Sequence, residues 1–240
     1  MVERNINYFY FAEEKFENTL KKTFTCMESK LSQKIQNDKL RIRSSEELSN
    51  QMEGLLILKK VLSLTLKKWF LSGGTLLGAY RDGDFIPWDW DIEVTVLTEE
   101  AINKKDLIIN NLLESGFILK KTNNTKENFK IVVEGWGTKY EILGRYLNKD
   151  GTLRERLMTK VSSKYFEKIE IVSFRGHEFP APSPVEDFLK ALYGNWKIPV
   201  KTTDKKSYFS DNAYKPLEHK LFEKLLKRIS IIIKFIKQKL

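Results

Sequence analysis

Three acidic side chains alternate with apolar ones in one short segment of this chain. Asp89, Asp91 and Glu93 occupy every second position of an expected strand over 88–97, so they leave the same face of that strand. Carboxylates crowded on one face repel one another, and a hard divalent cation such as Mg²⁺ relieves the repulsion while keeping open positions for substrate phosphates. The segment therefore predicts a metal site for a phosphate-bearing substrate. The alternative is an acidic strand edge that is merely solvated.

A pair of glycines precedes this acidic strand. Gly73 and Gly74 follow a short apolar strand over 69–71 and precede an expected helix over 75–80. Glycine allows close approach of the backbone, and the amide groups at the following helix start are suited to holding phosphate oxygens. Each signal is weak alone, but together on a strand, glycine pair, helix, turn and strand they favour a catalytic site.

The rest of the chain alternates helical and extended patterns. Ser44 and Glu47 form a capping-box signature that predicts a helix to about residue 68. A further helix is expected from 98 to about 115, and strands are expected over 117–119, 129–133 and 139–147, the last two as a hairpin around 135–137. This alternation predicts an α/β or α+β core whose sheet is buried against helices.

Composition sets limits on the class of protein. The 240 residues are 41% hydrophobic and 31% charged, which excludes collagen-like, disulfide-scaffold and wholly disordered chains. The single cysteine, Cys26, cannot form an internal disulfide. No apolar run is long enough to span a bilayer and no signal-peptide core follows Met1, so we expect a cytoplasmic protein.

Positive charge is concentrated near the carboxyl end. Residues 197–240 hold twelve Lys and Arg against four Asp and Glu, so 12 − 4 = +8 of the net charge of +10 lies there. Within this stretch, residues 216–240 predict a basic amphipathic helix. The helix could dock on the core with a solvated basic face, or lie on the inner face of the cell membrane as a peripheral contact. Nucleic acid is not expected, because aromatic residues do not interleave with the basic ones.

Three regions follow from these patterns. Residues 6–40 contain neither Gly nor Pro and predict one or two helices, so we expect an N-terminal helical region over 1–54. A catalytic domain is expected over 55–200. The basic C-terminal extension with its amphipathic helix then covers 201–240.

Two patches of sequence resemble a known family. Leu71-Ser72-Gly73-Gly74 with the residues to Arg81, followed by 85–93, is similar to the signature of the LicD/fukutin family of phosphotransferases. Tyr193-Gly194-Asn195-Trp196 is similar to the family's downstream Tyr-Gly-x-Trp segment. The resemblance spans about residues 55–200. It implies a nucleotidyltransferase-like α+β fold, with a mixed sheet flanked by helices and a core shared with DNA polymerase β.

The resemblance also implies an activity. Family members transfer a substituted phosphate, such as phosphocholine, from a CDP-activated donor to a hydroxyl of a cell-surface glycan of the lipopolysaccharide, capsule or teichoic-acid type. Mg²⁺ or Mn²⁺ assists. A CDP-choline-like donor and a glycan or glycolipid acceptor are therefore the expected partners, and the base of the nucleotide is left open.

Site residues follow from the same resemblance. Asp89, Asp91 and Glu93 are the expected catalytic metal ligands, where Glu93 replaces the family's aspartate and has a longer reach. A fourth carboxylate from a later strand matches Glu141 best, with Glu134 as its rival, and Glu141 could also act as the base.

Other residues are expected to hold the donor. Ser72, Gly73 and Gly74 match the phosphate-binding turn, and Arg81 is the candidate clamp for a donor phosphate through its planar fork, or else a turn residue facing solvent. Arg145 lies on the strand face of Glu141 and either assists or forms a plain salt bridge with a carboxylate.

Aromatic residues have two interpretations. Trp136 or Trp196 could surround a quaternary ammonium group if the cargo is choline, although core packing is the more common role.

Two other functions compete with the phosphotransferase. A true nucleotidyltransferase, which adds a nucleotide monophosphate to a small molecule, protein or RNA, needs the same carboxylates. A non-catalytic scaffold that keeps the fold is the third hypothesis, and the presence of every expected carboxylate argues against it.

Overall fold

The computed structural model describes residues 40–214. The helices expected over 6–40 and 216–240 therefore lie outside the described residues, apart from Leu40, and Cys26 lies outside them as well. Within the described part, none of the helices combines the length and apolar character that crossing a membrane requires.

The first described helix, α2 (Ser45–Thr65), begins with the predicted capping box. The Ser44 hydroxyl accepts a hydrogen bond from the Glu47 amide at 3.2 Å, and the Glu47 carboxylate accepts one from the Ser44 amide at 2.8 Å. Two otherwise unpaired amides are thereby satisfied. The helix buries Leu55, Leu58 and Leu62 completely, so its position is fixed by the core.

Removing this cap tests the local argument. We expect Ser44→Ala to lower the free energy of unfolding by about 1 kcal/mol, because the Glu47 amide loses its acceptor. Urea denaturation of the variant beside Ser49→Ala, which removes an exposed hydroxyl inside the same helix, measures the difference. Equal losses in the two variants would contradict a specific capping role.

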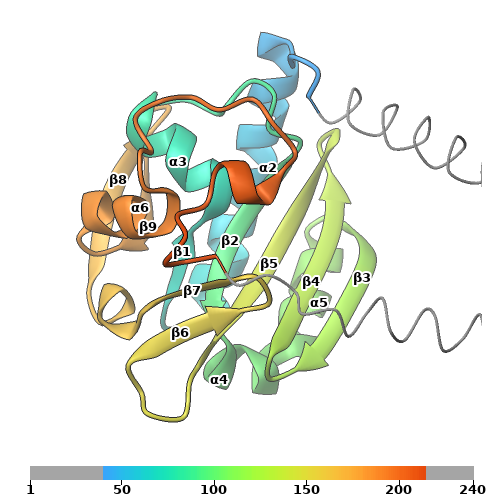
Figure 1. Ribbon diagram of the computed structural model, residues 1–240. Coiled ribbons are helices and arrows are strands. Elements are labelled where there is room, and N and C mark those ends of the chain that lie inside the picture. The colour runs from blue at the N-terminus through green and yellow to red at the C-terminus, as the bar shows by residue number, and fades with distance from the viewer. Residues whose placement is uncertain (1–39, 215–240) are drawn as a thin grey trace, which may run out of the picture. The chain divides into compact units, whose positions relative to one another are not determined.

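A seven-stranded mixed sheet forms the centre of the described residues (Figure 1). Five strands follow the order β1-β2-β5-β4-β3, and β6 and β7 extend from β5. Only β2 and β5 pair in parallel; the other described pairs are antiparallel. The strands are β1 (Trp69–Leu71), β2 (Asp91–Leu97), β3 (Ile118–Thr125), β4 (Asn128–Gly135), β5 (Thr138–Leu147), β6 (Leu153–Arg156) and β7 (Thr159–Ser162).

The two faces of the sheet differ in chemistry because side chains alternate along each strand. One face carries Ile92, which is paired with Tyr140, and the Tyr140 hydroxyl donates to the Gln51 carbonyl of α2 at 3.0 Å. Helix α2 approaches so closely that a Cβ on Gly54 would lie 2.0 Å from the Tyr140 oxygen. The apolar face is thus covered by α2, and the acidic residues of β2 lie on the opposite face.

The remaining elements surround the sheet. Helix α5 packs against α2 and β3, while α6 contacts β7 and β9, and β9 lies against β1 (Figure 1). They are α3 (Gly73–Arg81), α4 (Thr98–Ala101), η1 (Ile102–Lys104), α5 (Lys105–Glu114), η2 (Ser163–Phe166), β8 (Ile169–Phe174), β9 (His177–Pro182), α6 (Val185–Tyr193) and η3 (Lys205–Ser207).

The segment after α6 returns to the core. The Ser210 amide donates to the Leu192 carbonyl at 2.9 Å, and Tyr214 forms an isolated bridge with Thr159 of β7. Residues 201–214 therefore pack with the expected catalytic domain, and the boundary expected at residue 55 falls inside α2.

The expected α+β fold with a mixed sheet is confirmed, and several element boundaries differ. Helix α2 ends at Thr65 rather than at about residue 68. Strand β2 begins at Asp91 rather than at residue 88, because the Asp89 amide donates to the Ile86 carbonyl across a turn that contains Pro87. The helix expected from 98 to 115 is interrupted by η1. In addition, α3 starts two residues earlier than expected, β3 continues to Thr125, and β4 covers Asn128–Gly135 rather than 129–133.

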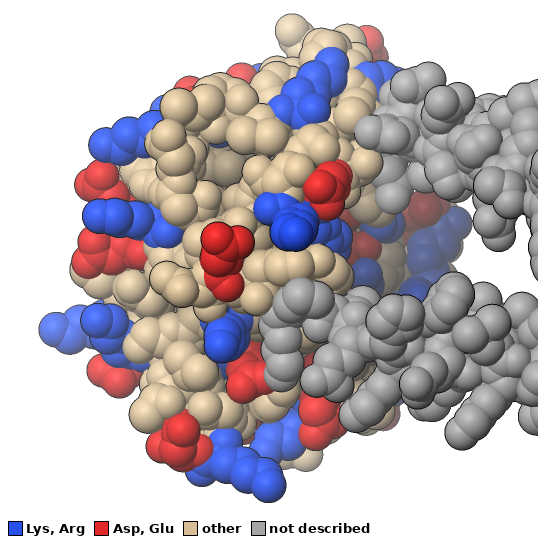
Figure 2. Space-filling view, in the orientation of Figure 1, with Lys and Arg blue, Asp and Glu red and all other residues tan. Residues whose placement is uncertain are grey.

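Charges on the described surface are mixed. Figure 2 shows Lys and Arg side chains interspersed with Asp and Glu on the visible face. The strongest positive excess expected from the sequence falls beyond Tyr214, where residues 215–240 hold eight Lys and Arg against two Glu.

Candidate active site

The start of α3 is fastened to β2. The Ser72 amide donates to the Glu93 carbonyl at 3.1 Å, and the Glu93 amide donates to the Thr75 hydroxyl at 2.9 Å. Gly73 has φ of +58°, a left-handed conformation that glycine adopts without strain. These contacts bring the first turn of α3 to the end of β2 that carries the acids.

Two carboxylates lie directly against the glycine pair. A Cβ on Gly73 would lie 1.6 Å from the Glu93 Oε2 atom, and a Cβ on Gly74 would lie 1.8 Å from the Asp89 Oδ2 atom. Any larger residue at either position would displace a carboxylate. Glycine is therefore needed at both positions to leave room for the carboxylates. The amino-terminal end of α3, which is the positive end of its dipole, faces these negative groups.

Burial and mutual repulsion raise the pKa of two of these acids. Burial, Asp91 and Glu93 raise the pKa of Asp89 well above its ordinary value. Burial, Glu93 and Glu141 raise the pKa of Asp91 to about 7. The structure thus brings all four expected carboxylates into one electrostatically coupled group, although Asp89 comes from the turn before β2 rather than from the strand itself.

Glu141 joins the group through the parallel pairing of β2 and β5, which places it beside Glu93. Lys130 lies 2.6 Å and Lys139 2.7 Å from its two carboxylate oxygens. Although burial raises the pKa of Glu141, the hydrogen bonds from these lysines bring it below its ordinary value. A lower pKa makes Glu141 a weaker proton acceptor, which does not favour the expected role as a base.

Lys139 lies between Asp91 of β2 and Glu141 of β5. Its ammonium is 3.5 Å from an Asp91 oxygen and 3.5 Å from the centre of the Trp90 ring. The protein thus supplies a cation of its own between Asp91 and Glu141.

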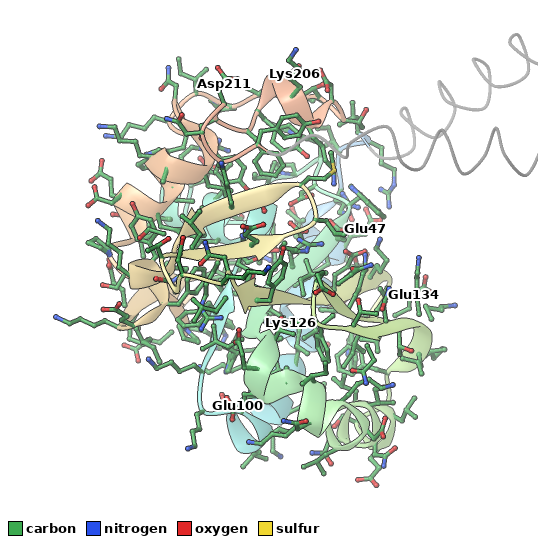
Figure 3. The ribbon with its side chains drawn as sticks, turned by 60° about the horizontal axis from the view of Figure 1, so that its bottom comes forward. Glu47, Glu100, Lys126, Glu134, Lys206 and Asp211 are labelled. Carbon is green, nitrogen blue, oxygen red and sulfur yellow. The ribbon has the colours of Figure 1, made fainter. Side chains whose placement is uncertain are left out.

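Glu134, the rival fourth carboxylate, is exposed. It forms an ion pair with Lys120 at 2.7 Å, and Figure 3 shows it at the outside of the molecule. Glu141 is therefore the better placed of the two.

Arg81 is engaged rather than free. Its guanidinium donates to both carboxylate oxygens of Asp82, at 2.8 Å and 2.7 Å, and its NH1 group lies 3.5 Å from the Trp196 carbonyl. Because its side chain is only 9% exposed, it is not a turn residue facing solvent either. A role as a phosphate clamp stays a prediction and would have to compete with Asp82.

Two tyrosines near the acids were not recognised from the sequence. Burial, Glu93 and Tyr208 raise the pKa of Tyr193, at the end of α6, and burial, Glu93 and Asp89 raise that of Tyr208. Tyr193 begins the Tyr-Gly-Asn-Trp patch, so its family resemblance was a signal. Tyr208 lies in the segment after α6, where the sequence offers no pattern.

The tryptophans do not come together as one aromatic group. Trp136 packs edge-on against Phe117, with ring centres 4.8 Å apart, and Trp196 packs against Tyr80 at 5.6 Å. Packing accounts for these contacts.

The donor set suits a hard cation, although the side chains are not arranged around one. Within residues 40–214, no group of three or more His, Cys, Asp and Glu side chains is arranged to hold a metal ion. The group nevertheless offers only carboxylate oxygens, and the pKa values of Asp89 and Asp91 are raised partly by repulsion from the neighbouring acids, so a divalent cation would relieve that repulsion. The chemistry of the residues therefore fits Mg²⁺ or Mn²⁺.

The structure combines a short strand, a glycine pair that opens a helix, an acidic strand and a parallel strand with a further acid. This is the arrangement that the sequence resemblance implied for a nucleotidyltransferase-like core. Residues 67–184 match the family described as LicD/FKTN/FKRP, nucleotidyltransferase domain. The resemblance to this family that the sequence predicted is therefore confirmed over residues 67–184.

Curated relatives include two mouse (Mus musculus) proteins. Ribitol 5-phosphate transferase FKRP is 26% identical over 148 residues, which are 56% of this chain and 29% of that protein. Ribitol-5-phosphate transferase FKTN is 29% identical over 163 residues, which are 63% of this chain and 34% of that protein. The matched region thus spans about a third of the length of these relatives.

A solved structure is also similar. The solution structure of antibiotic-resistance factor ANT(2'')-Ia matches 67% of this chain and 80% of that one, with 14% sequence identity and a TM-score of 0.44.

Proposed function

We propose that this protein transfers a substituted phosphate from a CDP-activated donor to a hydroxyl group of a glycan. The observation that carries the proposal is the mutually repelling group of Asp89, Asp91, Glu93 and Glu141 at the glycine-rich start of α3, within the residues that match the LicD family. Asp91 and Glu141 of this group are buried, and Asp89 and Glu93 are half-buried. In the reaction, the acceptor oxygen forms a bond to the distal phosphorus, the bond to the nucleotide phosphate breaks, and CMP leaves. The acceptor proton passes to a base.

Asp89, Asp91 and Glu93 would hold one or two divalent ions, with Glu141 as a further ligand. A bound Mg²⁺ or Mn²⁺ ion stabilises negative charge on the phosphate oxygens and on the leaving group. The chain's own contribution is to hold these carboxylates close together, so that they would bind a cation although Lys139 lies beside Asp91 and Glu141. The backbone at Ser72, Gly73 and Gly74 would orient the donor phosphates.

The transferred group belongs to the proposal as well. Phosphocholine is the cargo expected from the sequence, whereas the relatives are named as ribitol 5-phosphate transferases. Phosphocholine and ribitol 5-phosphate are both substituted phosphates, and the same four carboxylates could serve the transfer of either one. The acceptor glycan, of the lipopolysaccharide, capsule or teichoic-acid type, is proposed on the resemblance alone.

A donor panel tests the function. The protein is incubated with Mg²⁺ or Mn²⁺, a panel of CDP-linked donors including CDP-choline and CDP-ribitol, and glycan acceptors, and CMP release is followed by chromatography. Release confined to one CDP-linked donor supports the proposal and names the cargo. Silence with every donor and acceptor, while the divalent ion still binds, favours the scaffold hypothesis instead.

A nucleotidyltransferase is the second candidate, because the matched family is described as a nucleotidyltransferase domain. The same panel extended to nucleoside triphosphates separates the two functions. Pyrophosphate release, with a nucleotide monophosphate attached to the acceptor, would replace the first proposal by this one.

Lys139 provides a test of the metal ligands that does not depend on turnover. We expect Lys139→Met to bind Mn²⁺ about 10-fold more tightly than the wild type, because the divalent ion no longer competes with an ammonium beside Asp91 and Glu141. Calorimetric titration with Mn²⁺ measures the change. The matched control is Lys120→Met, because Lys120 forms its ion pair with the exposed Glu134, away from these acids. Weaker binding in Lys139→Met would exclude a metal site between these acids.

A further inference from the structure

Arg145 is a buried cation without the partners that such a group normally has. It lies on β5, on the same strand face as Glu141, and is only 4% exposed. Its Nε and NH1 atoms are completely buried, and neither has a hydrogen-bond partner within the described residues. The plain salt bridge considered from the sequence is not formed there. Because buried polar groups are almost always hydrogen-bonded, two orphan donors on one guanidinium require an explanation.

The charges around Arg145 do not neutralise it. Arg156, at the end of β6, is a second nearby guanidinium, and Glu93 and Tyr193 face the same region. Burial and Arg156 lower the pKa of Arg145 to about 10, so that it is still charged at neutral pH. Arg156 itself lies 3.7 Å from a Glu93 oxygen. Glu93 is thus in contact with Arg156 but not with Arg145, and an anion is the group that would balance the second positive charge.

The place of this pair relates it to the candidate active site. Glu93, which Arg156 contacts, lies with its carboxylate against Gly73 at the start of α3. Arg156 therefore reaches the carboxylate that borders the glycine turn, and Arg145 lies near both groups. Lys130 and Lys139, in contrast, are occupied by Glu141. A guanidinium presents a planar fork of donors that matches two oxygens of a phosphate group. A chloride or water molecule would leave part of that fork unused.

We propose that Arg145, with Arg156 beside it, binds a phosphate group of the substrate. That the anion is a substrate rests on the proposed function. The phosphate could come from the activated donor or be carried by the acceptor, and the experiment below separates these sources.

Orthophosphate is the first probe, in metal-free buffer at neutral pH. We expect 20 mM phosphate to raise the Tm of the wild type and to leave the Tm of Arg145→Met unchanged. The control is Arg175→Met, which removes the same charge from the turn between β8 and β9, where Arg175 is paired with Asp84. It should respond to phosphate as the wild type does. In phosphate-free buffer, Arg145→Met should be at least as stable as the wild type, because a buried unpaired charge has been removed.

CDP and glucose 6-phosphate then serve as probes for the two sources. We expect calorimetric titration to show at least about 10-fold weaker binding of one of them to Arg145→Met. A loss confined to CDP assigns the site to the donor, and a loss confined to glucose 6-phosphate assigns it to a phosphate on the acceptor. Arg145→Lys keeps the positive charge but lacks the planar guanidinium, so its loss of affinity should be intermediate. This variant replaces Arg145→Met in the experiment if Arg145→Met does not fold.

Equal affinity of the wild type and both Arg145 variants for all three probes would overturn the inference. This result is distinguishable from failure of the proposed function. Phosphate binding that depends on Arg145 in a protein that releases no CMP would keep the anion site and reject the transferase. CMP release by the protein, together with a phosphate affinity that is the same in the wild type and the Arg145 variants, would keep the transferase and reject the anion site.

Discussion

Asp91→Asn should abolish transfer, lowering the rate of CMP release by at least about 1,000-fold, because Asp91 is the central member of the carboxylate group. The substitution preserves the size of the side chain, so the sheet should stay intact. The loss is measured as the rate of CMP release from the donor that the wild type uses fastest. Asp106→Asn is the control, since Asp106 is an exposed carboxylate on α5.

The same variant should be more stable than the wild type when no metal is present. Its neutral amide removes repulsion with Glu93 and Glu141 and gives up only a long contact to Lys139, at 3.5 Å. We expect a Tm higher by about 2–4 °C at pH 8 in chelator, which corresponds to about 1 kcal/mol. Reduced activity together with reduced stability would instead mean that Asp91 serves the fold.

Gly74→Ala should separate activity from stability in a different way. The new methyl group would meet the Asp89 carboxylate, which is the flexible end of a side chain and can turn away, so the free energy of unfolding should change by about 1 kcal/mol or less. The displaced carboxylate is no longer placed for a metal or a donor phosphate. Because a misplacement of about 1 Å can cost 100-fold in rate, we expect a loss of about that size.

Gly83→Ala is the matched comparison for this variant. Gly83 has φ of +66°, and its added Cβ would meet nothing within 4 Å, so alanine there introduces backbone strain without touching the acids. It should lower the free energy of unfolding by about 1 kcal/mol and leave the rate of CMP release unchanged. Equal rates in Gly74→Ala and Gly83→Ala would argue that the glycine pair has no catalytic role.

Local patterns in the sequence were sufficient to predict the elements from α2 to β5, but not those from β6 to α6. The capping box at Ser44 and Glu47 located the start of α2, and the hairpin of β4 and β5 formed where Gly135 and Gly137 flank a turn. Such features depend on residues a few positions apart. The start of β2 was misplaced because alternation continues through Asp89, whereas the turn at Pro87 decides where pairing begins.

The candidate site could be predicted only in its acidic half. Asp89, Asp91 and Glu93 stand close together in the sequence, so their common location followed from spacing. The basic half consists of lysines and arginines from β4, β5 and β6 that meet the acids through strand pairing. The spacing of Lys139 and Glu141 on one strand face offered a clue, but no local pattern identifies Arg156 or Tyr208. Their positions depend on tertiary structure.

The parallel pairing of β2 with β5 also determines when the site can exist. During synthesis Asp89, Asp91 and Glu93 emerge first, whereas Lys139 and Glu141 follow only after the chain has passed through α4, α5, β3 and β4. Before β5 pairs with β2, water solvates each of these acids separately, so their affinity for a cation is low. Affinity for the ion and completion of the sheet should therefore arise in one cooperative step, so that an incomplete chain carries the acidic motif without its chemistry.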